Sequence, residues 1–236
     1  MYREIAKLIL YGDMDRDCIL YQFGEIFRRF DAKLSAKPEL IQDIYTQLKR
    51  LLIVATDYGF NHNLWHNYLT FFMVTNENPF SLTCEKVGAN DGSVNHFAKN
   101  DFRVFKNLFD FDFSVIEKEL DIDCFTQLSD YKAIGKKELM YNKNVSERII
   151  DLSTQLEQAP DENAFFDCVT AFYRDYGVGM FGLNKAFRIR EKADGAIEFL
   201  PINNMDKVML DDLVGYELQK KKLIDNTKAF VEDRKA

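Results

Sequence analysis

The sequence predicts a mainly helical fold of the α+β class, with one β-hairpin near residues 187–200. Apolar side chains recur at helical spacing along most of the chain, whereas alternation with a period of two is confined to short stretches. The 236 residues include only 11 glycines and 4 prolines, which are too few for a fold made of many turns. Hydrophobic residues make up 47% of the chain, enough for a substantial core that is rich in phenylalanine.

Three helices are predicted in the first third of the chain. The first covers residues 19–30, where apolar side chains return every three or four positions. The second begins near Pro38 and ends at Gly59. Its predicted apolar face consists of Ile41, Ile44, Tyr45, Leu48, Leu52 and Ala55. The third contains residues 65–72 and ends before the turn signal at residues 76–80.

The next segment carries weaker signals. Residues 84–101 are polar and contain glycine, which predicts a loop. Phenylalanine then alternates with aspartate at residues 109–113, which is typical of a short strand. Ser114 followed by Glu117 predicts a capping box at the start of a helix that reaches Leu120.

Helical spacing returns in the second half of the chain. It predicts one helix over residues 145–159 and another over residues 165–176, which Gly177 ends. Asp161 lies at the start of the latter helix, where the helix dipole favours a negative charge. A final helix is expected between Gly215 and about Phe230.

The predicted hairpin is the one place where a period of two is combined with a turn signal. Apolar residues alternate with polar ones on each side of Ala193-Asp194-Gly195. The flanking apolar pairs are Phe187 with Ile189 and Ile197 with Phe199.

Charge and cysteine usage exclude several classes of protein. The net charge is −7 and the isoelectric point is near 5.1, which argues against a nucleic-acid-binding protein that works by neutralising phosphates. The longest aliphatic run, residues 51–55, is far too short for a membrane helix, and no signal-peptide cleavage site is found. The four cysteines form no C-x-x-C motif, so reduced thiols in a cytoplasmic protein without a membrane partner are expected.

Gly177, Gly179 and Gly182 match the pattern G-x-G-x-x-G. In a dinucleotide-binding fold these glycines lie between a strand and the helix that follows it. Here they follow a predicted helix and precede a hairpin. We therefore interpret them as the end of a helix and a turn.

The histidines offer a candidate metal site. His62 and His66 are four residues apart on a predicted helix, so both imidazoles could face one metal ion, with His96 as a further ligand. The alternative is two ordinary histidines beside Trp65. Asp110 and Asp112 could act as an acid–base pair or bind a cation, although alternating carboxylates on the solvent side of a strand explain them as well. No catalytic residue is assigned.

The sequence contains no G-x-x-x-x-G-K-[ST] motif. Residues Lys220, Lys221 and Lys222 are too short a run for a nucleic-acid patch and are expected on the solvated face of the last helix. The chain therefore shows no means of its own to hold a nucleoside triphosphate and magnesium.

Several blocks of the sequence resemble the N-terminal half of an uncharacterised bacterial family of predicted AAA+ ATPases. These blocks are NHNLWHNYLTFFMVTNENPFSLTCEK, VGANDGSVNHFAKNDFRVFKNLFDFDF, YGVGMFGLNKAFRI and PINNMDKVMLDDLVGYE. The stretch from Met209, with its Leu-Val-Gly-Tyr turn and following helix, is similar to the segment that opens an AAA+ module. The resemblance extends over almost the whole chain.

The resemblance implies a division into a helical N-terminal domain, residues 1–202, and the opening segment of an AAA+ module, residues 203–236. It implies that the family continues after Ala236 with a strand and a Walker A loop, so that this chain is expected to be a fragment, a deliberately shortened N-terminal piece or a truncated gene product. Leu213, Val214, Gly215 and Tyr216 would then line one wall of an adenine pocket. ATP and Mg²⁺ are the cofactors expected for the full-length family, and homo-oligomers are expected there as well.

Three hypotheses for function follow. The first is a partner-recognition or regulatory part of a cytoplasmic AAA+ ATPase, whose partner is another protein or the ATPase module itself. The second is a metal-dependent enzyme that uses His62, His66 and His96. The third is a stand-alone helical scaffold for protein interactions.

Overall fold

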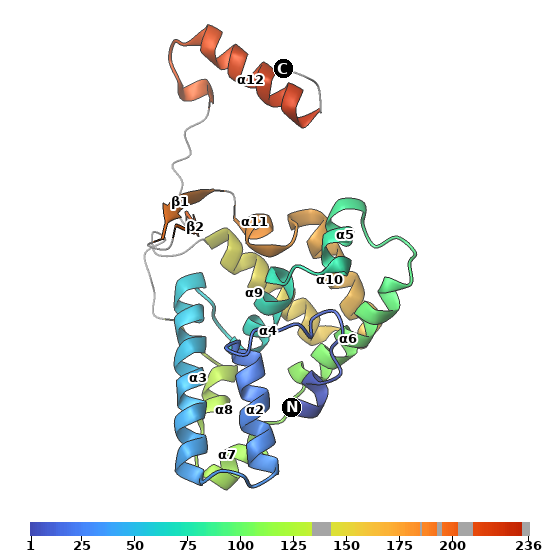
Figure 1. The fold of residues 1–236 in the computed structure, drawn as a ribbon, viewed down its shortest axis with the longest axis vertical. Helices are drawn as coiled ribbons and strands as arrows, with labels where there is room; N and C mark the ends of the chain where they lie inside the picture. The colour runs from blue at the N-terminus through green and yellow to red at the C-terminus, as the bar shows by residue number, and fades with distance from the viewer. Residues whose placement is uncertain (134–142, 185, 193–194, 203–209, 233–236) are drawn as a thin grey trace. The chain divides into compact units, whose positions relative to one another are not determined.

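The computed structural model describes residues 1–133, 143–184, 186–192, 195–202 and 210–232. It divides the chain into two compact units, Met1–Asn204 and Met205–Ala236. The first unit is an assembly of helices with one two-stranded antiparallel sheet (Figure 1). The predicted fold class, mainly helical with one hairpin, is therefore confirmed.

The first unit begins with a short helix, α1 (Tyr2–Ile5), and a longer antiparallel pair, α2 (Ile19–Asp31) and α3 (Lys37–Tyr58). Figure 1 shows α2 and α3 side by side, and α1 packs against α2. Pro38 lies in the first turn of α3, where its missing N–H costs no intrahelical hydrogen bond. The helix ends at Gly59, as the sequence predicts.

Helix α4 (Leu64–Thr75) lies at the centre of the first unit. It contacts α3 and four further helices whose bounds are given below: α6, α8, α9 and α11. Its side chains are apolar on nearly every side, which is typical of a helix that is surrounded by others. The Asn63 side chain accepts a hydrogen bond from the N–H of His66 at 3.0 Å and thereby caps the helix.

The loop predicted over residues 84–101 is largely wrong. Helix α5 (Pro79–Val87) covers its beginning and helix α6 (Val94–Phe109) its end, so that only residues 88–93 connect them. The Asn78 side chain accepts from the N–H of Ser81, while the Ser81 hydroxyl accepts from the N–H of Asn78, which forms a capping box for α5. In α6 the polar residues other than the buried Asp101 lie toward the solvent side, and their abundance conceals a buried stripe that contains Ala98, Phe102 and Phe105.

The strand predicted over residues 109–113 is also absent. Phe109 ends α6, and residues 110–113 lead into α7 (Ser114–Leu120). The rings of Phe111 and Phe113 both pack against Phe27 of α2, with centroids 5.1 and 5.9 Å from it. The alternation therefore reflects two rings turned into the core from a connection, not a strand.

The predicted capping box of α7 is wrong, although the helix itself is present. The Ser114 side chain caps nothing. Glu117 is buried and its carboxylate accepts from the N–H groups of Phe125 and Thr126, at 2.7 and 2.8 Å. These donors lie in the first turn of α8 (Cys124–Ser129), so Glu117 joins two helices instead of capping its own.

Helices α9 (Lys143–Gln158) and α10 (Glu162–Tyr176) agree with the sequence prediction. Asp161 accepts hydrogen bonds from the N–H groups of Asn163 and Ala164 at 2.9 Å and therefore caps α10. Its negative charge also lies where the helix dipole favours it. Helix α10 packs against α5, α6 and α9, and the rings of Phe165 and Phe166 contact Phe102 of α6.

The first unit closes with helix α11 (Gly179–Leu183) and the strands β1 (Phe187–Glu191) and β2 (Ile197–Pro201). The strands pair in an antiparallel register in which Ile189 lies opposite Phe199. The predicted hairpin is confirmed, while residues 193 and 194 of its turn lie outside the described residues.

The second unit contains a turn of 3₁₀-helix, η1 (Leu210–Asp212), and helix α12 (Glu217–Val231). The helix expected after Gly215 is therefore present. None of the residues of α12 is buried. Residues 203–209, at the start of the predicted opening segment of an AAA+ module, lie outside the described residues.

Candidate functional site

The structure separates the three histidines of the candidate metal site by their environment. His62 precedes the capping residue of α4 and has a left-handed backbone conformation, so it does not share a helix face with His66. It is exposed, and its backbone pairs with that of Tyr131. His96 is exposed on α6. Within the described part of the chain, no group of three or more His, Cys, Asp or Glu side chains could hold a metal ion.

His66 is a buried core residue with a specific partner. Its Nε2 lies 2.9 Å from the carbonyl oxygen of Phe109. Since a carbonyl can only accept, Nε2 donates and the neutral ring leaves Nδ1 without a proton. Nδ1 is buried without a hydrogen bond and lies 3.7 Å from Oε1 of Glu157.

Burial sets the titration of His66. Desolvation lowers the pKa of the imidazole below its ordinary value, because the charged form loses its hydration. The hydrogen bond to Phe109 and the carboxylates of Glu157 and Asp110 oppose this shift, while Lys106 adds to it. The structure therefore favours a neutral histidine in the core.

Asp110 and Asp112 do not lie on a strand, and each has a local role. Asp110 forms an ion pair with Lys106 of α6 at 3.2 Å. Asp112 accepts from the N–H of Ser114 at 2.8 Å, and this hydrogen bond lowers the pKa of its carboxyl group. These contacts account for both residues as surface and turn residues.

The glycines of the G-x-G-x-x-G pattern meet a steric requirement. Gly177 ends α10 in a left-handed conformation, with φ of 80°. A Cβ atom there would lie 2.9 Å from Oε1 of Glu85, and one at Gly182 would lie 2.6 Å from the carbonyl carbon of Gly177. The two glycines are thus needed where the chain passes from α10 into α11.

Three of the four cysteines show no sign of activation. All four are free thiols. Burial raises the pKa of Cys84 and Cys168, and raises that of Cys124 to about 11. Raised values keep these thiols protonated at neutral pH, which makes them poor nucleophiles.

The residues of the expected adenine wall lie in the turn before α12. Val214 is 92% exposed, and Leu213 and Tyr216 are also exposed. The carbonyl of Leu213 accepts from Nζ of Lys220 at 3.0 Å, which links the turn to the first part of α12. Lys221 and Lys222 are exposed on this helix.

Helix α3 has an uncovered face, and two residues of this face, Tyr45 and Leu52, were wrongly predicted to lie on the buried side. The buried side is formed by Leu40, Ile44, Gln47, Leu48, Leu51 and Ala55. Tyr45, which was expected inside, is 49% exposed, and Leu52 is exposed as well. The apolar residues of α3 occupy more of its circumference than α2, α4 and α9 cover, so the choice of buried side depends on how the helices pack.

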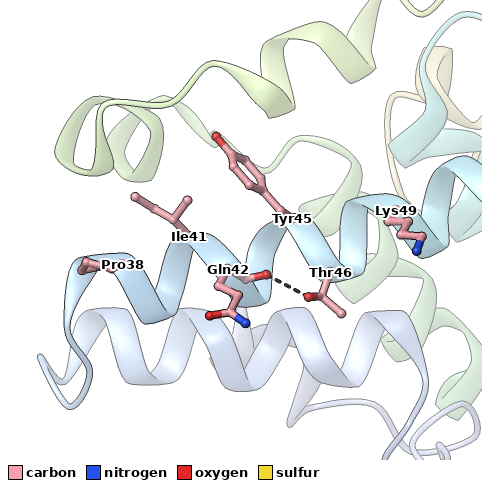
Figure 2. A pocket seen from close by; sticks show the side chains of 6 residues that line it. All are labelled: Pro38, Ile41, Gln42, Tyr45, Thr46 and Lys49. Carbon is pink, nitrogen blue, oxygen red and sulfur yellow. Dashed lines mark hydrogen bonds between the residues drawn. The ribbon is translucent and has the colours of Figure 1, made fainter.

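A shallow hollow of about 550 Å³ lies on this uncovered face. It is lined by Pro38, Ile41, Gln42, Tyr45, Thr46 and Lys49. In Figure 2 the side chains of Ile41 and Tyr45 lie on one side of the helix, and those of Gln42 and Thr46 on another. The hydroxyl of Thr46 donates to the carbonyl of Gln42, so it is satisfied within the helix.

The hairpin and α11 form a second uncovered apolar surface. Phe181 of α11 contacts the rings of Phe187 and Phe199, with centroids 4.9 and 5.4 Å away. Phe181 is nevertheless 61% exposed, and Ile189 is 69% exposed. The sequence predicts Phe187, Ile189 and Phe199 as strand residues, and their alternation indicates that one face of the hairpin should be covered. The alternation does not show that this face stays largely exposed in the described residues.

Residues 183–236 match a family model described as "Protein of unknown function (DUF815)". No curated protein and no solved structure matches the chain. The matched region contains β1, β2 and α12. Among the described residues, the large apolar side chains with the highest exposed fractions lie in this region. Among the described residues, none of the helices has the length and apolar character to span a membrane.

Proposed function

We propose that this chain is the partner-recognition and regulatory N-terminal part of a cytoplasmic AAA+ ATPase. The resemblance of its sequence blocks to predicted AAA+ ATPases supports this role. The match of residues 183–236 to an uncharacterised family fits with it but names no activity.

One structural observation carries the proposal. Helix α12 and the turn before it expose apolar side chains of a kind that folded domains usually bury, including Phe230, which is 85% exposed. A single helix of this length is marginal in water without tertiary packing. A larger module that packs against α12 would provide that cover, and the opening segment of an ATPase is such an element.

In this role ATP and Mg²⁺ are bound mainly by the rest of the module. The exposed apolar side chains of Leu213, Val214 and Tyr216 suit one wall of a pocket for a planar base. Phosphoryl transfer also needs a phosphate cradle and a metal ion to neutralise charge, and the present sequence has no Walker A motif. Homo-oligomerisation is expected of the complete protein.

Two kinds of experiment test the proposal: sequencing of the gene downstream of the present chain, and ATP-binding and hydrolysis assays on the purified protein. The reading frame that follows the codon for Ala236 should encode a G-x-x-x-x-G-K-[ST] motif. The present chain should neither bind ATP at micromolar concentrations nor hydrolyse it, whereas the longer product should do both. Hydrolysis by the present chain, or a downstream frame without a P-loop, would refute the proposal.

A further inference from the structure

We infer that the free edge of β1 binds an extended segment of a partner protein in which acidic residues alternate with apolar ones. This inference names the partner chemistry for the recognition role proposed above and rests on that role. It is carried by the hydrogen-bonding pattern of the hairpin, by its uncovered face and by its charges.

The hydrogen bonds between β1 and β2 show which backbone groups of β1 are not paired with β2. The N–H of Lys192 donates to the carbonyl of Ala196, and the N–H of Ile202 donates to the carbonyl of Ala186. Hydrogen-bonded pairs recur at every second residue of an antiparallel ladder. Phe187, Ile189 and Glu191 therefore direct their N–H and C=O groups away from β2, and these groups form what we call the β1 edge.

The β1 edge is the better of the two edges for adding a strand. The corresponding position at the end of β2 is Pro201, which has no N–H to donate. Among the described residues, the sheet consists of two strands alone. A two-stranded sheet is marginal in water and gains stability from a third strand.

The side chains beside the β1 edge alternate in character. Ile189 and Phe187 lie on the face that also holds Phe199 and Ile197, and most of this face is exposed. Arg188 and Arg190 lie on the opposite face. A strand added at this edge would place apolar residues beside Ile189 and its neighbours, and would place its alternate residues beside the two arginines.

The charges of Arg188 and Arg190 determine which residue types are favoured at the alternate positions of the added strand. Arg190 is paired with Glu198 across the hairpin, whereas Arg188 has no ion pair within the described part of the chain. Opposite charges on directly facing residues stabilise a sheet, and like charges destabilise it. The edge therefore selects a strand with acidic residues opposite Arg188 and Arg190.

The same charges exclude a second copy of this chain as the occupant. Antiparallel pairing of two β1 strands about Ile189 would set Arg188 of each copy opposite Arg190 of the other, which is repulsive. The chain does contain an alternating acidic and apolar stretch at residues 109–113. Its rings are packed in the core against Phe27 and Phe125, so it is not free to bind.

The probe for this inference is a short labelled peptide, Thr-Val-Glu-Ile-Glu-Val-Thr, whose binding to the chain of residues 1–236 is followed by fluorescence anisotropy. Binding should weaken by about tenfold in Arg188→Glu, because an attractive cross-strand pair becomes a repulsive one. Arg16→Glu is the matched control, since Arg16 is also exposed and the change in net charge is the same. Its affinity should equal that of the wild type.

Two further measurements complete the test. A peptide with lysine at both glutamate positions should bind Arg188→Glu better than the wild type. Addition of the acidic peptide should slow hydrogen exchange at the amides of Ile189 and Glu191, which are free in the hairpin. Equal binding of both peptides to the wild type, equal weakening in Arg16→Glu, or no change in exchange would overturn the inference.

The outcome is separable from that of the proposed function. Absence of peptide binding overturns the inference even where the downstream frame encodes a P-loop. Binding with the expected charge dependence supports the inference, and the ATPase proposal is then decided by the reading frame and the nucleotide assays alone.

Discussion

Two buried carboxylates show how single residues hold distant segments of this fold together. Asp101 is fully buried and accepts from the N–H groups of Ile9, Leu10 and Tyr11, at distances of 2.7–3.1 Å. Glu117 does the same for the first turn of α8. A buried carboxylate is tolerated when several N–H donors satisfy it. Each of these residues therefore fixes a connection that the helices alone would leave free.

His66 predicts a dependence of stability on pH. Its pKa is lowered in the folded protein, so the unfolded chain binds a proton more readily. The free energy of unfolding should therefore fall as the pH is lowered through about 6.5 and below, by less than about 1.4 kcal/mol per pH unit for one proton. Urea unfolding of the wild type and of His66→Gln at a series of pH values measures this.

The His66 variant should lose that part of the pH dependence, although it is expected to be less stable at neutral pH. His96→Gln is the matched control, because His96 is exposed. It should retain the wild-type profile. A profile for His66→Gln that runs parallel to that of the wild type would contradict this account.

At the scale of elements, the ends of the helices are set by particular residues. Asn63, Asn78 and Asp161 each accept from N–H groups at the start of a helix. These caps are local, and of the three only Asp161 was predicted at the start of a helix. Ser114 is the exception, because it is the first residue of α7 and not its N-cap, which is Phe113, while the Glu117 carboxylate is engaged by α8.

At the junction between α10 and α11, adding one methyl group to Gly177 is expected to lower the stability of the fold strongly. Gly177→Ala should lower the free energy of unfolding by about 1–3 kcal/mol, because its left-handed backbone and close neighbours disfavour a Cβ atom. Gly92→Ala is the matched control. A Cβ at Gly92 would meet only the carbonyl oxygen of Asn90 at 3.9 Å. Urea denaturation compares them, and equal stability of the two variants would refute the steric role of Gly177.

At the scale of the whole molecule, the two units differ in how much they bury. The first unit contains a continuous core that extends from Ile5 to Leu183, whereas α12 contributes nothing to a core. Contact density determines how often a segment opens. The two units should therefore differ greatly in local stability.

Hydrogen exchange measures this difference directly. In the isolated chain, the amides of α12 should exchange orders of magnitude faster than those of α10, because α12 has only its own helical hydrogen bonds to protect it. Mass spectrometry of peptic fragments from both helices gives the comparison within one sample. Equal protection of α12 and α10 would show that α12 is covered, and would remove the structural support for the proposed module entry.

The sequence predicted two parts of the candidate site, the hairpin residues and the turn before α12. It did not predict which surfaces stay uncovered. Phe187 and Phe199 follow from alternation, since a period of two is a property of the strand itself. The exposure of Ile189 and Tyr45 does not, because an apolar side chain on a correct face is buried only if another element packs there. The i, i+4 relation of His62 and His66 failed because the helix begins after His62.

The sequence by itself determined where most helices lie, because helical periodicity, Gly59, Gly177 and Pro38 act within a few residues of the chain. It also determined the hairpin and the absence of a Walker A motif. The structure also shows that α5 and α6 are helices, although their signals, the Asn78 cap and the spacing of Ala98, Phe102 and Phe105, are local ones that the sequence analysis missed. Only the tertiary structure decided which side of α3 is buried and that Phe111 and Phe113 enter the core. These outcomes depend on contacts between residues far apart in the sequence, and periodicity holds no information about a packing partner.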